Sequence, residues 1–177
     1  MKNLLTLYRE SIDLQAKSSL KFKILSKEEV KKLLKEIDNY NKNPHYSKET
    51  IEKTFHTENE YFGLFDGEIC LSLLSTQENV PENGIIYIHE LASFFPGKGY
   101  GMKLLNNILS RFENIWFMSN PEGGENLLKN YRKLNGLDEY VVKNSSYKGE
   151  DLHFFLKFSD ENLKKKTIEF VENIWKN

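Results

Sequence analysis

The most constraining feature of the sequence is a continuous stretch, residues 85–112, that joins an apolar segment, a glycine-rich turn and an amphipathic segment. Residues 85–93 are rich in β-branched and aromatic side chains, which is typical of a strand buried over most of its surface. Glycines then stand at every second position from Gly97, and apolar residues recur at helical spacing as far as Phe112. The pattern therefore predicts a central strand that leads through a glycine loop directly into a helix.

A glycine loop that opens a helix is suited to binding an anion. Glycine lets the backbone approach a ligand closely, and the free N–H groups of the first helical turn, together with the helix dipole, favour a phosphate. The loop reads Gly97-Lys98-Gly99-Tyr100-Gly101, which fits neither the Gly-x-x-x-x-Gly-Lys-Ser/Thr loop of nucleoside triphosphate sites nor the Gly-x-Gly-x-x-Gly of dinucleotide sites. We therefore expect a phosphate-binding loop of another class.

This stretch resembles the acyl-coenzyme A loop of the GNAT superfamily of N-acetyltransferases, in which a strand ending in a Leu-Ala-Val-like triplet precedes Arg/Gln-x-x-Gly-x-Gly/Ala and a helix. The triplet here is Leu91-Ala92-Ser93, and Pro96 stands where the family has Arg or Gln, with a shorter spacing between triplet and loop than is common. The resemblance implies that acetyl-coenzyme A binds here as a co-substrate. The implied binding residues are Leu91, Ala92, Ser93, Gly97, Lys98, Gly99, Tyr100, Gly101 and Met102.

Composition limits the other functions that the chain could have. Its 177 residues fit one domain, and a hydrophobic content of 39% with 29% charged residues describes a globular protein. A formal net charge of -1 gives no support to a large nucleic-acid surface, so nucleic acid is not an expected partner. Cys70 is the only cysteine, which excludes an internal disulfide and a cysteine metal cluster, and we expect no metal site.

The expected compartment is the cytoplasm. A single cysteine fits a reducing environment, and the apolar run at residues 4–8 is too short for the core of a signal peptide. No run of about 18 apolar residues is present, so we expect no membrane association. Whether the protein forms a homodimer is left open.

The rest of the chain supplies the other elements of one domain. Short apolar or aromatic runs predict six further strands, at residues 22–25, 61–65, 69–74, 114–118, 140–142 and 152–158. Capping residues and helical spacing predict helices after Ser26, after Ser47, over 127–134, in an N-terminal extension at 1–20 and in a C-terminal helix at 159–177. We therefore expect residues 1–177 to form a single α/β domain of GNAT type, with a mixed, mostly antiparallel sheet of about seven strands flanked by helices.

A second resemblance to the family lies in the helix predicted near residue 131. Residues 125–137 look like the family's Asn-x-x-Ala-x-x-x-Tyr-x-x-x-Gly-Phe helix with Tyr131 in register, although Leu127 replaces the Ala and Gly136 falls one residue late. In the family this tyrosine can protonate the leaving thiolate, so the resemblance implies that Tyr131 is the catalytic acid. A phenol suits this role because it stays protonated at neutral pH. From the residues alone, a core tyrosine with a satisfied hydroxyl is the alternative.

Acetylation of an amine also needs a base, and His89 and Glu90 are the candidates. In a regular strand they point to opposite faces, so only one could meet the acceptor. His89 is the first choice, because the family often carries a polar or acidic residue at that place. A bulge near the strand end would expose Glu90 instead. Both residues could also serve only as hydrogen-bonding groups within the sheet.

The expected function is acyl-coenzyme A-dependent N-acyltransfer, in which an acetyl group moves to an amine by direct attack in a ternary complex. The acceptor is a small-molecule or peptide amine, and the sequence does not say which. The alternative is a catalytically silent module of the same fold that binds coenzyme A or a partner protein. Pro96, Leu127 and the short spacing before the loop favour this alternative.

Overall fold

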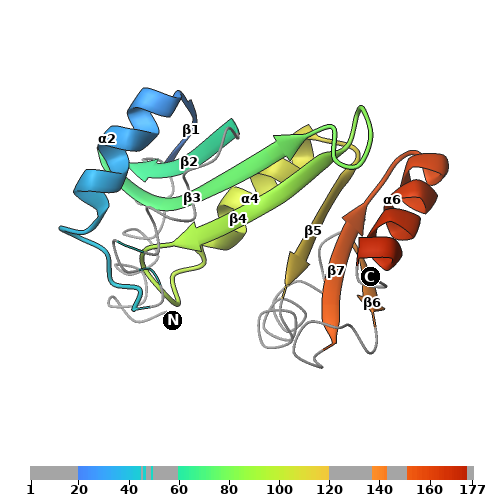
Figure 1. Ribbon diagram of the computed structural model, residues 1–177. Coiled ribbons are helices and arrows are strands. Elements are labelled where there is room, and N and C mark those ends of the chain that lie inside the picture. Colours follow the sequence, from blue (N-terminus) through green and yellow to red (C-terminus); the bar gives the residue numbers. More distant parts are fainter. Residues whose placement is uncertain are drawn as a thin grey trace, which may run out of the picture.

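The computed structural model describes residues 20–44, 46, 49, 60–119, 137–142 and 151–174, and Figure 1 shows their arrangement. Seven strands form one sheet in the order β1-β2-β3-β4-β5-β7-β6. Their bounds are β1 (Leu20–Leu25), β2 (Glu60–Asp66), β3 (Ile69–Glu78), β4 (Ile86–Ser93), β5 (Ile115–Ser119), β6 (Asp138–Val142) and β7 (Leu152–Lys157). Only β4 and β5 pair in parallel, and every other neighbouring pair is antiparallel. The predicted α/β class with a mixed, mostly antiparallel sheet is confirmed.

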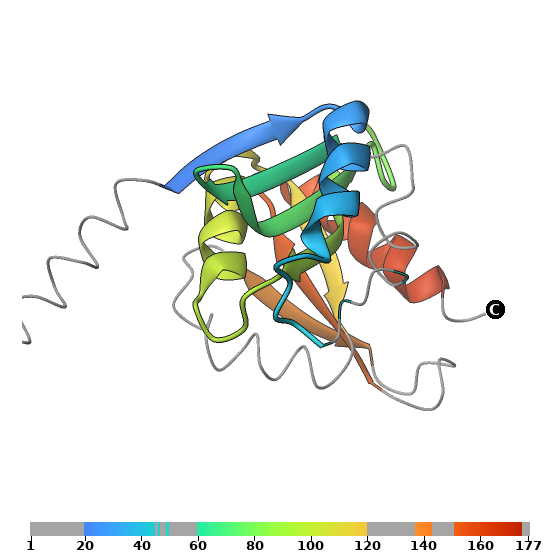
Figure 2. The ribbon, with the colours of Figure 1, turned by 90° about the vertical axis from the view of Figure 1, so that its left-hand side faces the viewer.

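Helices cover both faces of the sheet. They are α2 (Lys27–Ile37), α4 (Tyr100–Arg111) and α6 (Glu161–Ile174). Seen along the sheet in Figure 2, α4 lies on one side and α2 and α6 lie on the other. The predicted C-terminal helix is therefore present as α6. The helix expected at 1–20 lies outside the described residues except for Leu20, which is the first residue of β1. The helices expected after Ser47 and over 127–134 also lie outside them, apart from Glu49.

Local sequence signals account for the helix that follows β1. Ser26 and Glu29 form the predicted capping box, with the Ser26 Oγ accepting from the Glu29 N–H at 3.2 Å and the Glu29 carboxylate accepting from the Ser26 N–H at 2.7 Å. The apolar positions of α2 then pack against β2 and β3 on one face of the sheet. Among the described residues, no helix is long and apolar enough to cross a membrane.

The two faces of the sheet carry separate cores. Under α4, the residues Leu104, Leu105 and Ile108 pack with Phe62 and Ile115. On the opposite face, one cluster lies between α2 and strands β1 to β4, and another lies between α6 and strands β5 to β7. The core under α4 spans the β4–β5 junction, because it joins Ile86 and Ile88 of β4 with Ile115 and Phe117 of β5.

Candidate active site

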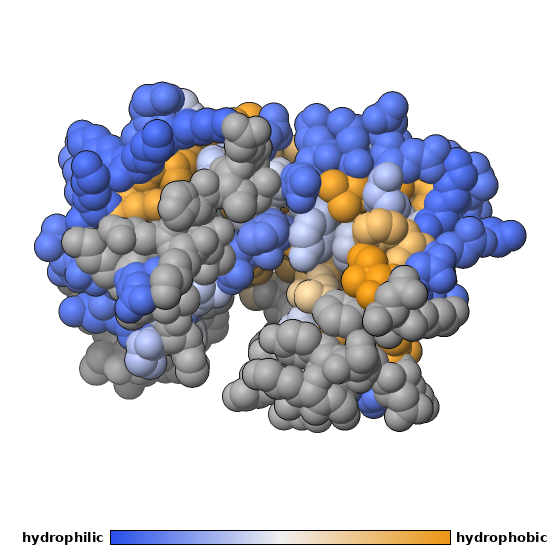
Figure 3. All heavy atoms as spheres, in the orientation of Figure 1, coloured by the Kyte–Doolittle hydropathy of each residue, from blue (hydrophilic) through white to orange (hydrophobic). Residues whose placement is uncertain are grey.

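The sheet opens between β4 and β5. The two strands pair only through Ile86 with Ile115 and Tyr87 with Trp116, and each strand then runs on without further pairing to the other. Figure 1 shows them diverging, and the space-filling view in Figure 3 is hollowed between the two halves of the sheet. The C-terminal half of β4 therefore presents one edge that β5 does not cover.

The backbone direction of β4 tells which groups face this opening. The Phe94 N–H donates to the Leu71 carbonyl of β3 at 3.0 Å, so Ala92 and Phe94 turn their backbone groups toward β3. Leu91 and Ser93, which alternate with them, turn theirs toward the opening. The Leu91 carbonyl lies 3.0 Å from the Tyr46 hydroxyl, and the Ser93 carbonyl accepts from the Asn43 amide at 2.8 Å. An extended ligand with amide carbonyls could accept from the N–H groups at this edge.

The glycine loop lies directly beside this edge. Gly97 and Gly99 have φ angles of 74° and 73°, a left-handed conformation that glycine adopts without strain. Gly99 is the N-cap of α4 and has no side chain to occupy the first N–H groups, and the first turn contains no acidic residue. The cap residue therefore offers these N–H groups no side-chain acceptor. An anionic ligand could fill that role.

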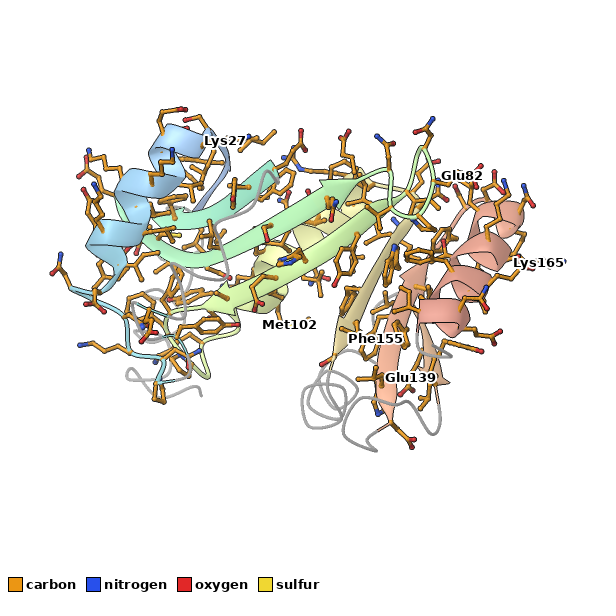
Figure 4. All side chains as sticks on the ribbon, viewed as in Figure 1. Lys27, Glu82, Met102, Glu139, Phe155 and Lys165 are labelled. Atoms are coloured by element: carbon orange, nitrogen blue, oxygen red, sulfur yellow. The ribbon has the colours of Figure 1, made fainter. Side chains whose placement is uncertain are left out.

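The start of α4 packs against the end of β4. A Cβ atom added at Gly101 would lie 3.6 Å from the Cβ of Ser93, which is ordinary van der Waals contact. Met102 is labelled in Figure 4 at the start of α4, beside the end of β4. The structure thus brings the predicted strand residues 91–93 and loop residues 97–102 together. Within the strand, the buried Ala92 faces the α2 side and its carbonyl accepts from the Ser72 hydroxyl at 2.6 Å.

Strand β4 carries a bulge where the candidate bases lie. Ser75 of β3 is opposite Glu90 and Thr76 is opposite Ile88, so His89 has no residue opposite it. Ile88 packs in the core under α4. After the extra residue, Leu91 also faces α4. The regular alternation that would separate His89 from Glu90 is therefore wrong, because the bulge inserts one residue and shifts the parity.

His89 and Glu90 consequently lie on the same face, opposite α4. The His89 ring meets the Tyr87 ring edge-on with centroids 6.0 Å apart, and Tyr87 belongs to the core on that face. Glu90 accepts a hydrogen bond at 2.7 Å from the hydroxyl of Tyr46, which packs against the core beneath α2. His89 is exposed and Glu90 is half-buried. Both candidate bases can therefore meet an acceptor on one face.

Two phenols flank the Glu90 carboxylate. Burial raises the pKa of Tyr46 well above its usual value, and the negative charge of Glu90 raises it further. The pKa of Tyr87 is also raised by burial and then by the charge of Glu90. Both hydroxyls therefore remain protonated at neutral pH and can donate hydrogen bonds.

The segment after α2 follows the end of β4 residue by residue. The Asn43 Nδ2 donates to the Ser93 carbonyl at 2.8 Å, and the Lys42 N–H donates to the Phe94 carbonyl at 2.8 Å. Further back along β4, the Tyr46 hydroxyl lies within hydrogen-bond distance of the Glu90 carboxylate and the Leu91 carbonyl. Sequence analysis did not single out this segment. Its asparagines were the available signal, because asparagine amides often bond to nearby backbone.

Two residues singled out in the sequence, Tyr131 and Cys70, remain to be placed. Tyr131 lies outside the described residues, so its predicted role is not tested by the structure. Cys70 is fully buried in β3, and burial raises its pKa to about 12, which makes it a poor nucleophile at neutral pH. Among the described residues, no group of three or more His, Cys, Asp or Glu is arranged to hold a metal ion.

The fold matches solved structures of acetyltransferases. The ribosomal-protein-S18-alanine N-acetyltransferase from Escherichia coli aligns with a TM-score of 0.56 at 15% identity, over 81% of this chain and 97% of that chain. A chimera of the Vibrio cholerae spermidine N-acetyltransferase and hSSAT aligns with a TM-score of 0.57 at 18% identity, over 82% and 98% of the two chains. A chain of the NatC complex bound to Gag peptide and CoA aligns with a TM-score of 0.53 at 16% identity, over 80% and 99%.

Sequence comparison adds no closer relationship. No family model matches the sequence, and no curated protein matches it. An acetyltransferase of the GNAT family from Bacillus cereus is among the similar structures, with a TM-score of 0.51 at 16% identity over 80% of this chain and 99% of that chain. The chain therefore has the GNAT acetyltransferase fold, and the resemblance seen in its sequence is confirmed at the level of the fold.

Proposed function

We propose that the protein is an acyl-coenzyme A-dependent N-acyltransferase that moves an acetyl group to an amine. The observation that carries this proposal is the opening between β4 and β5, which lies beside a glycine loop at the N-terminus of α4. The same fold occurs in the spermidine N-acetyltransferase chimera and in the NatC complex with CoA. A fold alone does not assign an activity, so the proposal also rests on the residues of the site.

The residues of the site fit acetyl-coenzyme A. The N–H groups of Leu91 and Ser93 can donate to the amide carbonyls of its extended arm, and the first N–H groups of α4 can hold its pyrophosphate. Lys98 is exposed in the loop and adds a positive charge beside that position. When bound, acetyl-coenzyme A would supply a thioester whose carbonyl carbon accepts an amine nitrogen.

In this proposal the chain supplies a base, an acid and orientation. Glu90 or His89 takes a proton from the acceptor amine, so that the nitrogen lone pair is free to attack. Tyr131 gives its hydroxyl proton to the sulfur as the thioester carbon–sulfur bond breaks. Holding donor and acceptor together in one complex replaces a bimolecular encounter with an oriented one, and no covalent enzyme intermediate is needed.

The acceptor is an amine on a small molecule or a peptide. The fold neighbours include a spermidine acetyltransferase and a ribosomal-protein alanine acetyltransferase, which represent these two kinds of acceptor. A carboxylate on the acceptor face, at Glu90, favours an acceptor that arrives as a protonated, positively charged amine. We place this activity in the cytoplasm, and nucleic acid is not needed as a partner.

A silent coenzyme-binding module is the second candidate. Pro96 favours it, because proline lacks the N–H that another residue would offer at that position of the loop. Both candidate functions include coenzyme binding, but only the first includes transfer of the acetyl group.

Transfer assays with Tyr131→Phe separate the two candidates. Purified protein is incubated with acetyl-coenzyme A and each of spermidine, an alanyl peptide and Nα-acetyl-lysine, and free thiol is measured. We expect transfer to at least one amine, and a loss of roughly 10²- to 10⁴-fold in Tyr131→Phe with coenzyme affinity retained. Coenzyme binding without transfer to any amine would instead support the silent module. Undiminished transfer by Tyr131→Phe would remove the acid role from this residue.

A further inference from the structure

We propose that Tyr46 is a positioning residue that holds Glu90 as the proton-accepting group on the acceptor face. This inference rests on the proposed function and deepens it, because it assigns the base and adds a residue outside the glycine loop and β4. The contact joins residues 44 positions apart in the sequence, from the segment after α2 to the bulge of β4. It therefore depends on the fold and not on local sequence.

The position of Tyr46 is fixed at its backbone and at its ring. The Asn41 side-chain amide donates to the Tyr46 carbonyl, and the Tyr46 N–H donates to the Asn43 carbonyl at 3.1 Å. The Tyr46 ring meets the buried Phe94 ring at 77° with centroids 6.4 Å apart. A tyrosine with so many contacts loses little further entropy when its hydroxyl bonds to a neighbour. Its hydroxyl is therefore a preorganised donor.

The hydroxyl of Tyr46 has two acceptors within reach. It lies 2.7 Å from Glu90 Oε1 and 3.0 Å from the Leu91 carbonyl oxygen. A phenol has one proton, so it donates to one acceptor at a time and can accept a bond on its own oxygen. While Glu90 is ionised, the shorter, charge-assisted bond to the carboxylate is the stronger of the two.

This arrangement serves Glu90 in both of its protonation states. When Glu90 takes the amine proton, an N–H bond breaks and an O–H bond forms on the carboxyl group. The new O–H can donate to the Tyr46 oxygen while the Tyr46 proton turns to the Leu91 carbonyl. No proton is lost from the pair and no oxidant or reductant is needed. Burial and the charge of Glu90 raise the pKa of Tyr46, which keeps its own proton in place.

His89 lacks comparable support. Within the part of the chain that the structure describes, its imidazole makes no hydrogen bond, and its ring contact is the edge of Tyr87. It is also the extra residue of the bulge and is exposed. Catalytic groups work best when their neighbours hold them in the productive geometry. Of the two candidate bases, Glu90 is therefore the one whose side chain a neighbouring residue fixes in position.

A double-mutant cycle tests the assignment. Tyr46→Phe keeps the ring and removes the hydroxyl, and Glu90→Met keeps an unbranched chain and removes the carboxylate. With the most rapidly acetylated of the three amines above, we expect Tyr46→Phe to lower kcat roughly 10-fold while the Kd for acetyl-coenzyme A changes less than about twofold. In the Glu90→Met background, Tyr46→Phe should cause no further loss.

Tyr40→Phe is the matched control. The Tyr40 hydroxyl accepts from the Cys70 N–H at 3.3 Å, and its ring stacks on Phe95, so it lies on the same segment but does not touch Glu90. This variant should leave kcat within about twofold of the parent. An equal loss of kcat from Tyr46→Phe with and without the Glu90 carboxylate would overturn the positioning role, as would an unchanged kcat.

An activity-independent measurement separates this inference from the proposed function. Urea midpoints of the parent, the two single variants and the double variant report whether the side chains are coupled in the fold. We expect Tyr46→Phe to lower the urea midpoint less in the Glu90→Met background than in the parent. If the parent acetylates none of the amines, the proposed function fails, and coupled midpoints still keep Tyr46 as the residue that holds Glu90. Additive midpoints overturn that role whatever the activity.

Discussion

The Nζ atom of Lys157 on β7 lies 2.9 Å from the carbonyl oxygen of Phe112, the C-cap residue of α4. It also donates to the Leu109 carbonyl in the last turn of that helix. Lysine at a helix C-terminus satisfies carbonyls that have no partner within the helix and complements the dipole. Because β4 and β5 pair through only two residues each, this contact adds to the few hydrogen bonds that join the halves of the sheet, among them that from Trp116 Nε1 to the Val80 carbonyl.

Replacing Lys157 with Met should weaken that tie without removing the apolar stem of the side chain. The half-buried ammonium would be lost and two carbonyls would lose a charged donor. We expect the free energy of unfolding to fall by about 1–2 kcal/mol, as measured by urea titration. Lys165→Met is the matched control, because the Lys165 side chain is 78% exposed on α6 and should change stability by less than about 0.5 kcal/mol. Equal effects of the two substitutions would show that Lys157 is not a cap.

Two serines of β3 offer a controlled comparison of a satisfied and an unsatisfied hydroxyl. Ser72 and Ser75 are both fully buried, but the Ser72 hydroxyl donates to the Ala92 carbonyl at 2.6 Å, whereas the Ser75 hydroxyl has no hydrogen-bond partner in the part of the chain that the structure describes. Ser72→Ala should lower the free energy of unfolding by about 1 kcal/mol. Ser75→Ala should leave it unchanged or raise it, because it removes a buried polar group without breaking a bond. Thermal or urea unfolding of the two variants measures both effects. Equal losses of unfolding free energy in Ser72→Ala and Ser75→Ala would contradict the prediction.

The part of the site that could be predicted from sequence is the part that is continuous in sequence. Strand β4, the glycine loop and α4 lie within residues 86–111, so glycine spacing and hydrophobic periodicity were enough to place them. The capping box of α2 is equally local, since Ser26 and Glu29 are three residues apart.

What escaped prediction depends on contacts between distant segments. A bulge near the end of β4 was one of two alternatives that the sequence left open. The register of β3 against β4 decides between them, because the sequence of β4 fits a regular strand as well as a bulged one. Tyr46 meets Glu90 only because the segment after α2 folds back along β4. Sequence analysis expected only one of the two residues to face the acceptor, His89 in a regular strand or Glu90 after a bulge, whereas the structure places both on one face. Tertiary register, which has no local signature, accounts for the difference.

The buried thiol of Cys70 predicts a loss of stability at alkaline pH. Burial raises its pKa from 9.0 to about 12 in the folded protein. A group whose proton is held more tightly in the folded state stabilises the fold below its unfolded pKa, and this contribution is lost as the pH rises from about 9 toward 12. Cys70→Ala removes the group. We therefore expect the fall in free energy of unfolding between pH 9 and 11 to be less steep in Cys70→Ala, by up to about 1.4 kcal/mol per pH unit.

The measurement is a series of urea titrations at fixed pH, and the comparison is between slopes because Cys70→Ala also lowers stability at every pH by shrinking a core side chain. Ser72→Ala, two residues further along β3 and also buried, is the control for a small loss of volume without loss of a titrating group. It should keep the slope of the parent. Parallel pH profiles for the parent and Cys70→Ala would show that the thiol does not contribute.

The proposed coenzyme site predicts that acetyl-coenzyme A stabilises the protein through the loop before α4. A ligand at 100 times its Kd adds about 2.7 kcal/mol to the free energy of unfolding, which corresponds to a rise in Tm of roughly 5–10 °C for a domain of this size. Substitutions at Gly99 would test this poorly, because its φ of 73° strains any other residue regardless of the ligand. Lys98 is the better position, since it is exposed in the same loop.

Lys98→Glu should fold normally and reduce the coenzyme-induced rise in Tm, because it places a carboxylate where a pyrophosphate is expected to bind. Lys31→Glu makes the same change of charge at an exposed position of α2, and its response to acetyl-coenzyme A should equal that of the parent. Differential scanning fluorimetry with acetyl-coenzyme A from 10 μM to 1 mM measures all three proteins. No rise in the parent at 1 mM would count against the coenzyme site itself, and equal responses of Lys98→Glu and Lys31→Glu would place the phosphates away from this loop.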